Sequence, residues 1–156
     1  MTTLIACLHT GTMVSDSCIS HGVVRFRSMK KVKKAGPFLA GVAGDFGPAL
    51  AYLTRFSSAV RGYRSDAPPT LPAYEGDFEL LVLGRAGMWL YGQDGTPIEV
   101  EEDVYAIGSG GAHAMGALYM QERMLMAYDL EAAMEVACEL DPASQLPLVS
   151  LSLSAK

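Results

Sequence analysis

The residues with the clearest chemical potential open the chain, in the sequence Met1-Thr2-Thr3. Methionine before a small residue is normally removed by the general aminopeptidase, which would leave Thr2 first. A free N-terminal threonine holds a hydroxyl nucleophile beside an α-amine whose ordinary pKa, about 7.7–8.0, lets it act as the base. A nearby lysine would lower that pKa, and an aspartate could hold the lysine in place. Thr2 is therefore a candidate nucleophile, although Met-Thr is also a common start without function.

A cluster of positive charge is the second chemical feature. Six of the twelve basic residues fall within ten positions, 25–34, whereas the rest of the chain holds six basic against seventeen acidic residues. Lysines at 30, 31, 33 and 34 do not all fit on one face of a strand or helix, so we expect one to point inward. The alternative interpretations of this cluster are a solvated strand edge, a phosphate-binding patch and a nucleic-acid contact. The net charge of −5 disfavours nucleic acid as a partner.

Other motifs are weaker. The glycine run 108–116 (GSGGAHAMG) has His113 where a dinucleotide fingerprint needs its third glycine, and no Walker loop is present. Cysteines and histidines show neither disulfide nor zinc-ligand spacing, so we expect no metal and no cofactor. Cys7 and Cys138 lie in apolar periodic segments typical of a core, and Cys18 is a minor candidate nucleophile.

The elements that must position these residues follow from the apolar pattern. Expected strands cover residues 2–8, 13–20, 23–29, 37–43, 78–83, 87–91, 98–100, 104–107 and 147–153. A first helix is expected from the turn at 44–48 to about Arg61, followed by a proline-rich surface loop over 62–77. A second helix follows the glycine run, and a third follows Asp129 as its N-cap. The second helix is expected to bury one stripe of residues, namely Met115, Leu118, Tyr119, Leu125 and Met126.

The order of strands and helices favours α+β layers over regular β–α alternation. The length of 156 residues fits one domain, 1–156, and 50% apolar residues suffice for a core. No window approaches the roughly 20 apolar residues of a membrane span, and the start lacks a secretory signal pattern. We therefore expect a cytoplasmic protein with no membrane partner.

Several blocks together resemble the HslV and proteasome β-subunit family, from Thr2 to roughly Val149. The matching blocks are TTLIACLHTG at the start, Asp16–Ser20, the lysine-rich stretch 28–34, residues 39–44 (LAGVAG), residues 105–111 (YAIGSGG) and the Asp-x-x-Ser at 141–144. The resemblance implies a four-layer αββα sandwich of the N-terminal nucleophile (Ntn) hydrolase type. It also implies a threonine-type peptidase that assembles as a homo-oligomer of stacked rings and cleaves peptide or unfolded protein substrates.

Carried over residue by residue, the resemblance implies a complete site. Thr2 attacks the peptide carbonyl, Lys31 lowers the pKa of its amine, and Asp16 pairs with Lys31. The Gly44 N–H donates to the oxyanion, a type of contact worth about 3–4 kcal/mol. Further hydrogen bonds around the amine would come from Ser109, Asp141 and Ser144. The substrate strand and an apolar specificity pocket would be lined by Ile19, Ser20, Met29 and Val42.

The chain departs from the family pattern in two places. Residues 45–48 (DFGP) replace smaller residues at the pocket rim, and the loop 63–77 replaces most of the family's second helix, which shortens the helical layer. Because that region lies near the face that the family presents to its AAA+ unfoldase ATPase, this partnership stays open. The alternative function is a catalytically silent Ntn-fold protein that forms rings or binds a partner.

Overall fold

The computed structural model describes residues 2–17, 19–21, 24–26 and 30–153. Its helices are α1 (Phe46–Ala59), α2 (Gly111–Arg123) and α3 (Leu130–Leu140). Its strands are β1 (Thr3–Cys7), β2 (Thr12–Asp16), β3 (Ile19–His21), β4 (Val24–Phe26), β5 (Val32–Ala35), β6 (Phe38–Gly44), β7 (Phe78–Leu83), β8 (Met88–Tyr91), β9 (Ile98–Val100), β10 (Val104–Gly108) and β11 (Leu148–Ser152).

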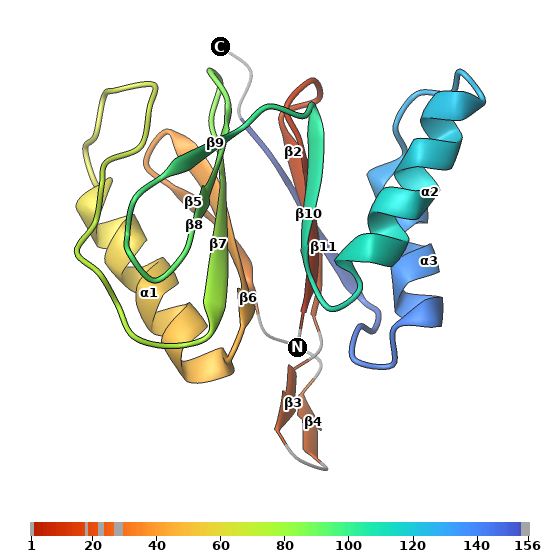
Figure 1. Ribbon diagram of the computed structural model, residues 1–156, viewed down its shortest axis with the longest axis horizontal. Helices are drawn as coiled ribbons and strands as arrows, with labels where there is room; N and C mark the ends of the chain where they lie inside the picture. Colours follow the sequence, from red (N-terminus) through yellow and green to blue (C-terminus); the bar gives the residue numbers. More distant parts are fainter. Residues whose placement is uncertain (1, 18, 22–23, 27–29, 154–156) are drawn as a thin grey trace.

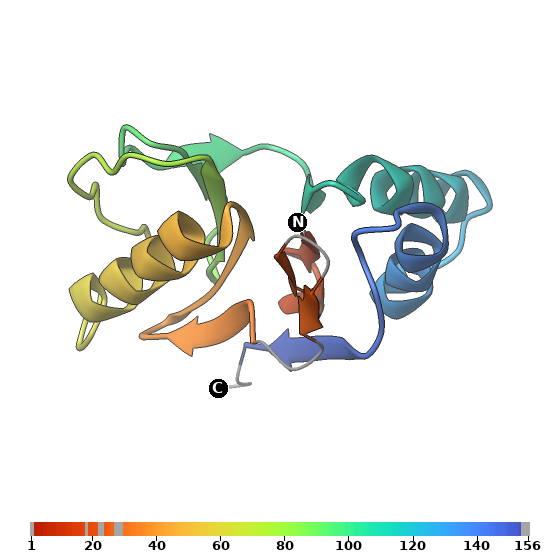
Figure 2. The same ribbon diagram turned by 90° about the horizontal axis from the view of Figure 1, so that it is seen from below.

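Two antiparallel sheets face each other between helices. Sheet I has the strand order β10-β1-β2-β11, and sheet II has the order β5-β6-β7-β8-β9. Figure 1 shows α1 outside sheet II and the pair α2–α3 outside sheet I, and the turned view of Figure 2 shows the same four layers. The β3–β4 hairpin extends beyond one end of the sheets. The expected αββα sandwich is confirmed.

The apolar runs of the central strands build this layering because both faces of each sheet are buried. In β6, Phe38 and Val42 pack toward α1, whereas Leu39 packs between the sheets. In β1, Leu4 packs between the sheets and its neighbour Ile5 packs toward α2 and α3. Alternate side chains of one strand thus enter different cores, which is why these strands read as continuous apolar segments.

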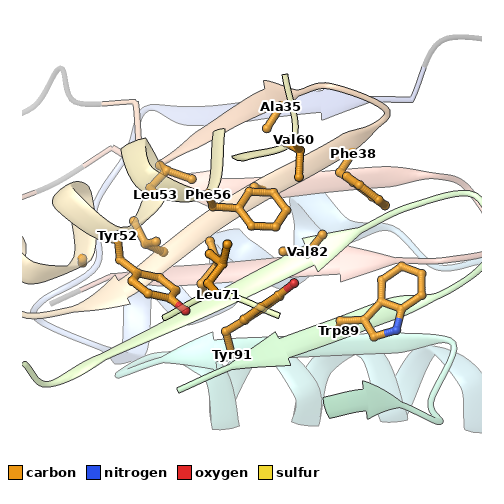
Figure 3. Close-up of a cluster of buried hydrophobic side chains, with 14 of the residues drawn as sticks. Ala35, Phe38, Tyr52, Leu53, Phe56, Val60, Leu71, Val82, Trp89 and Tyr91 are labelled. Atoms are coloured by element: carbon orange, nitrogen blue, oxygen red, sulfur yellow. The ribbon is translucent and has the colours of Figure 1, made fainter. Parts of the chain in front are cut away.

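The core beneath α1 is rich in aromatic side chains, as Figure 3 shows. The rings of Tyr52 and Phe78 lie 4.5 Å apart between centroids, and the rings of Phe56 and Tyr91 lie 5.7 Å apart in a T-shaped contact. Such ring pairs add about 0.5–1.5 kcal/mol each beyond the apolar area that they bury. This core fixes α1 on sheet II, and therefore fixes the turn at Gly44 that leads into the helix.

The helical layer outside sheet II is short, as expected. In the described residues, α1 is followed by the irregular segment 60–77 with no second helix. This segment is nevertheless tied to the sheet. The Tyr91 hydroxyl donates to the Pro69 carbonyl at 2.8 Å, and the Leu71 N–H donates to the Gly95 carbonyl at 2.9 Å. Leu71, only 6% exposed, covers part of the core.

Two strand predictions need correction. The single strand expected over 13–20 is two strands, because β2 leaves sheet I after Asp16 and β3 pairs with β4 in a separate hairpin. The lysine-rich β5 was not expected, because its composition is typical of a solvated segment. It forms because Val32 and Ala35 are buried while the backbone pairs with β6.

The predicted buried stripe of the second helix is partly wrong. Leu118 is buried, but Tyr119, Leu125 and Met126 are 58%, 95% and 54% exposed. The helix ends at Arg123, so Leu125 and Met126 lie in the connection to α3. The third helix follows the prediction, with the Asp129 carboxylate accepting from the Ala132 N–H at 3.0 Å. No helix in the described part of the chain is long and apolar enough to cross a membrane.

Candidate active site

Thr2 lies at the entrance of β1, next to the end of β10. Its carbonyl accepts a hydrogen bond from the Ser109 N–H at 3.0 Å, and the residue is 6% exposed. Gly108 has a left-handed φ of 88°, and a Cβ there would lie 1.8 Å from the Thr2 carbonyl oxygen. Only glycine permits this approach. The glycine run therefore serves to seat Thr2.

A buried ion pair lies beneath the start of β1. The Lys31 Nζ donates to both carboxylate oxygens of Asp16 at 2.9 and 3.0 Å, and the two side chains are 3% and 0% exposed. Asp16 ends β2 and Lys31 immediately precedes β5, so the pair joins the two sheets. The same carboxylate accepts from the Thr3 N–H at 2.9 Å. The inward-pointing lysine expected from the charge pattern is Lys31.

Asp141 is a second buried carboxylate of this site. It accepts hydrogen bonds from the hydroxyls of Ser109 at 2.6 Å and Ser144 at 2.7 Å, and from the Ala143 N–H at 3.1 Å. Burial alone would raise the pKa of Asp141, but these hydrogen bonds and the nearby His113 outweigh it and hold the pKa below its ordinary value. Asp141 is therefore built to stay ionised, and it orients Ser109 against Thr2.

Thr3 links the two carboxylates. Its hydroxyl contacts the Ser144 hydroxyl and accepts from the Gly110 N–H at 2.9 Å. Because the Ser144 hydroxyl donates its one proton to Asp141, the Thr3 hydroxyl is the donor to Ser144. The hydrogen bonds thus run in one direction from Gly110 to Asp141. Thr3 was not identified from the sequence. The available signal was the alternation of side chains in extended backbone, which turns the neighbours Thr2 and Thr3 to opposite sides and gives them different partners.

Gly44 ends β6 with a φ of 107°, and a Cβ there would lie 2.4 Å from the Asp77 carbonyl oxygen. This turn opens two hollows that share Thr2. A cleft of about 890 Å³ is lined by Thr2, Gly44, Asp45, Phe46, Gly47, Asp77, Phe78, Glu79, Gly108 and Ser109. A pocket of about 20 Å³ is lined by Thr2, Lys31, Val42, Ala43, Gly44, Phe46, Ala49 and Leu50.

The structure brings together the residues predicted for catalysis, from elements far apart in the sequence. Val42, predicted to line an apolar specificity pocket, lines the smaller hollow. Ile19 and Ser20 belong to β3 in the separate hairpin, and their contact with a substrate stays a prediction. Met29 and Cys18 lie outside the described residues. Sequence reasoning did not single out Asp77 and Glu79, which line the larger cleft from the loop before β7 and from β7 itself.

Comparison with known proteins decides the family. No family model matches the chain. The ATP-dependent protease subunit HslV of Lysinibacillus sphaericus (strain C3-41) is 30% identical over 161 residues, which cover 89% of this chain and 89% of that protein. The chain belongs to the HslV family.

Other relatives agree with this assignment. The HslV subunit of Bacillus cereus (strain B4264) is 28% identical over 158 residues, covering 87% of the chain and 88% of that protein. Family membership makes the chain a protease of the HslV kind. The resemblance to the HslV and proteasome β-subunit family that the sequence indicated is thereby confirmed over most of the chain.

Solved structures support the HslV fold. Thiobacillus denitrificans BPH in complex with epoxomicin superposes with a TM-score of 0.72 at 21% identity, covering 99% of this chain and 100% of that one. Eukaryotic HslV from Trypanosoma brucei gives a TM-score of 0.71 at 21% identity, covering 97% of this chain and 99% of that one.

Proposed function

We propose that this HslV-family chain is an N-terminal threonine endopeptidase of one Ntn-hydrolase domain, 1–156, and that Thr2 becomes its nucleophile when Met1 is removed. The observation that supports this most strongly is the buried pair of Lys31 and Asp16 beside Thr2. Burying two charges costs several kcal/mol per ion before their attraction repays it, so a structural role alone is a weak reason for the pair. A positive charge that lowers the pKa of a catalytic amine is a sufficient reason to bury the pair.

The first half of the reaction forms an ester. The Thr2 Oγ attacks the carbonyl carbon of the peptide bond, and its hydroxyl proton passes to the free α-amine of the same residue. The Lys31 ammonium lowers the pKa of that amine and keeps a fraction of it unprotonated at neutral pH. The Gly44 N–H donates to the oxyanion that develops, a contact worth about 3–4 kcal/mol where it has been measured.

The second half releases the product. The C–N bond breaks, the leaving amine takes the proton from the Thr2 amine, and the acyl group stays on Oγ as an ester. Water then attacks the ester carbonyl with the amine as base, which restores the hydroxyl. Asp141 holds Ser109 and Ser144 in place around the amine during both halves.

We also propose that the protein acts as a homo-oligomer of stacked rings. The relatives are named ATP-dependent protease subunits, which supports an assembly of several chains with an AAA+ unfoldase ATPase. Large apolar side chains exposed on one layer support an interface there. They are Tyr119, Met120, Met124, Leu125, Met126, Val136 and Leu140, on α2, α3 and their connection.

The test is the intact mass of the purified protein before and after a peptide epoxyketone, a class that includes the epoxomicin bound by Thiobacillus denitrificans BPH. Such a probe closes a ring only with a hydroxyl and a free amine on one N-terminal residue. We expect a chain without Met1 that gains one probe, and a Thr2→Ala variant that folds but gains none and hydrolyses no peptide. A chain without Met1 that gains no probe would support the silent alternative, and a chain that keeps Met1 would contradict the mechanism.

A further inference from the structure

The two hollows that meet at Thr2 differ in size and polarity. The smaller one, about 20 Å³, is lined by the apolar residues Val42, Ala49 and Leu50 together with Lys31. It is too small to hold a large side chain without rearrangement. The cleft of about 890 Å³ is the only one of the two with room for several residues of a peptide. The chemistry of its walls therefore bears on which peptides bind.

The walls of this cleft are acidic. The carboxylates come from Asp45 before α1, from Asp77 before β7 and from Glu79 within β7, and all three residues are exposed. Among the described residues that line the cleft, none is a lysine, an arginine or a histidine. Three negative charges thus share one hollow without an opposing charge on its walls.

These carboxylates have no other task that the structure shows. Asp45 is the N-cap residue of α1, yet its side chain makes no capping hydrogen bond. Asp77 is held through its backbone, because its carbonyl accepts from the Asp45 N–H at 2.7 Å. In the described part of the chain, neither these two side chains nor that of Glu79 takes part in an ion pair. All three are available to a bound molecule.

Thr2 identifies the cleft as a binding site independently of its charge. The residue is 94% buried, and its hydroxyl has no hydrogen-bond partner among the described residues. It lines the cleft together with Ser109. The Thr2 residue is largely buried, but its unpartnered hydroxyl is open to the cleft, which suits a group that meets a ligand.

We propose that the cleft selects peptides with a lysine or arginine side chain close to the scissile bond, an inference that rests on the proposed function. Like charges in a cleft with low-dielectric walls focus the field and raise the local concentration of an oppositely charged group. The N-terminus of α1 opposes this with about half a positive charge, which three full negative charges outweigh. The Phe46 side chain, which lines the cleft and is 45% exposed, adds a ring for a cation–π contact with the lysine or arginine of the peptide.

The test uses pairs of quenched fluorescent peptides that differ in one residue, lysine or its uncharged isostere norleucine. That residue is placed in turn at each of the three positions on either side of the cut. We expect a kcat/KM about 3- to 10-fold higher for lysine at one or more of these positions, the range of a few partly exposed ion pairs. The preference should shrink in about 0.5 M salt because exposed charges are then screened.

Variants connect the preference to the cleft. In the double variant Asp77→Asn, Glu79→Gln, the ratio of kcat/KM for the lysine peptide to that for the norleucine peptide should fall toward one. The control Asp66→Asn, in the loop after α1 and outside the cleft, should leave this ratio unchanged. Equal rates for lysine and norleucine peptides in the unaltered protein would overturn the proposal. So would a preference that survives in the double variant.

Labelling separates this inference from the proposed function. Epoxyketone labelling with equal peptide rates overturns the charge selectivity and leaves the threonine mechanism standing. If neither labelling nor cleavage occurs, the threonine mechanism fails, and fluorescence anisotropy of the labelled lysine and norleucine peptides on the same protein then decides the selectivity. Tighter binding of the lysine peptide, lost in the double variant, would support it; equal binding would overturn it.

Discussion

At the scale of single residues, the site depends on two buried carboxylates with different partners. Asp16 accepts from the Lys31 ammonium and from the Thr3 N–H, so one side chain positions both the cation and the start of β1. Asp141 accepts from two hydroxyls and one N–H instead. The first carboxylate balances a charge, whereas the second orients neutral groups. The two are therefore expected to respond differently to substitution.

Asp141 predicts a specific dependence of stability on pH. Its pKa in the folded protein lies below the ordinary 3.8, so its ionised form stabilises the fold above that value. This contribution is lost as the pH falls through the folded pKa. Asp141→Asn should lower the free energy of unfolding by about 1.5–3 kcal/mol at neutral pH, the range for hydrogen bonds to a charged group.

The measurement is thermal unfolding of the unaltered protein and of Asp141→Asn between about pH 7 and pH 2. The difference in Tm should be constant above roughly pH 5 and should shrink as the pH drops below the ordinary pKa of an aspartate. The exposed Asp66→Asn serves as the control with the same change of charge. A difference that stays constant down to the lowest pH would show that Asp141 acts by packing and not by its charge.

At the scale of elements, the ends of two strands form the site. β6 ends at Gly44 and β10 ends at Gly108, each with a left-handed φ and each beside Thr2. These ends meet because β6 lies in sheet II and β10 in sheet I, and the sheets pack face to face. At Gly41, within β6, a Cβ would lie 2.0 Å from the Leu4 Cδ1, so the sheets approach closely there. Small displacements of these strands would therefore move the site.

Gly108→Ala tests this dependence. The added Cβ would lie 1.8 Å from the Thr2 carbonyl oxygen at a φ of 88°, so the start of β1 must shift. A displacement of about 1 Å in a catalytic group costs on the order of 100-fold in rate, and we expect kcat/KM to fall at least that far.

Gly116→Ala is the matched control. A Cβ there has nothing within 4 Å, and alanine should stabilise this helical position by about 0.5–1 kcal/mol without changing the rate. Both variants are compared by steady-state peptide hydrolysis, with circular dichroism as the check on folding. Near-normal activity in a folded Gly108→Ala variant would contradict the role given to the turn.

At the scale of the whole molecule, the two outer layers are unequal. Outside sheet II lies one helix and a tethered loop, whereas the layer outside sheet I exposes many large apolar side chains. Leu125 is 95% exposed and holds a left-handed φ of 55°. An exposed leucine in an unfavourable backbone conformation does not stabilise a lone chain. This supports burial of the α2–α3 layer in an assembly.

The double variant Met120→Asp, Leu125→Asp should therefore dissociate the oligomer. Burying one such side chain contributes about 1.5–3 kcal/mol, and each 1.4 kcal/mol changes an association constant tenfold. Light scattering after size-exclusion chromatography measures the mass. Ile98→Asp is the control, because Ile98 is 61% exposed on β9 of the other sheet. Equal masses for all three proteins would place the interface elsewhere.

The sequence by itself determined most of the local structure and the family. The alternation in β1 and β6, the Asp129 cap and the loop over 62–77 depend on residues close along the chain, and such patterns are visible without coordinates. The glycine blocks and the pair Asp16 and Lys31 could be assigned by resemblance. These residues lie at or beside strand ends that meet in the fold.

Only the tertiary structure decided what depends on contacts between distant segments. The resemblance named Lys31, but its burial against Asp16 depends on the pairing of β5 with β6 and on the packing of the two sheets. Thr3 gained its partners because the segment after α3 brings Ser144, and the segment after β10 brings Gly110, to its hydroxyl. The exposure of Leu125 followed from where α2 stops. Periodicity reports which side of an element is apolar, whereas the packing of two sheets and their helices selects which distant side chains meet.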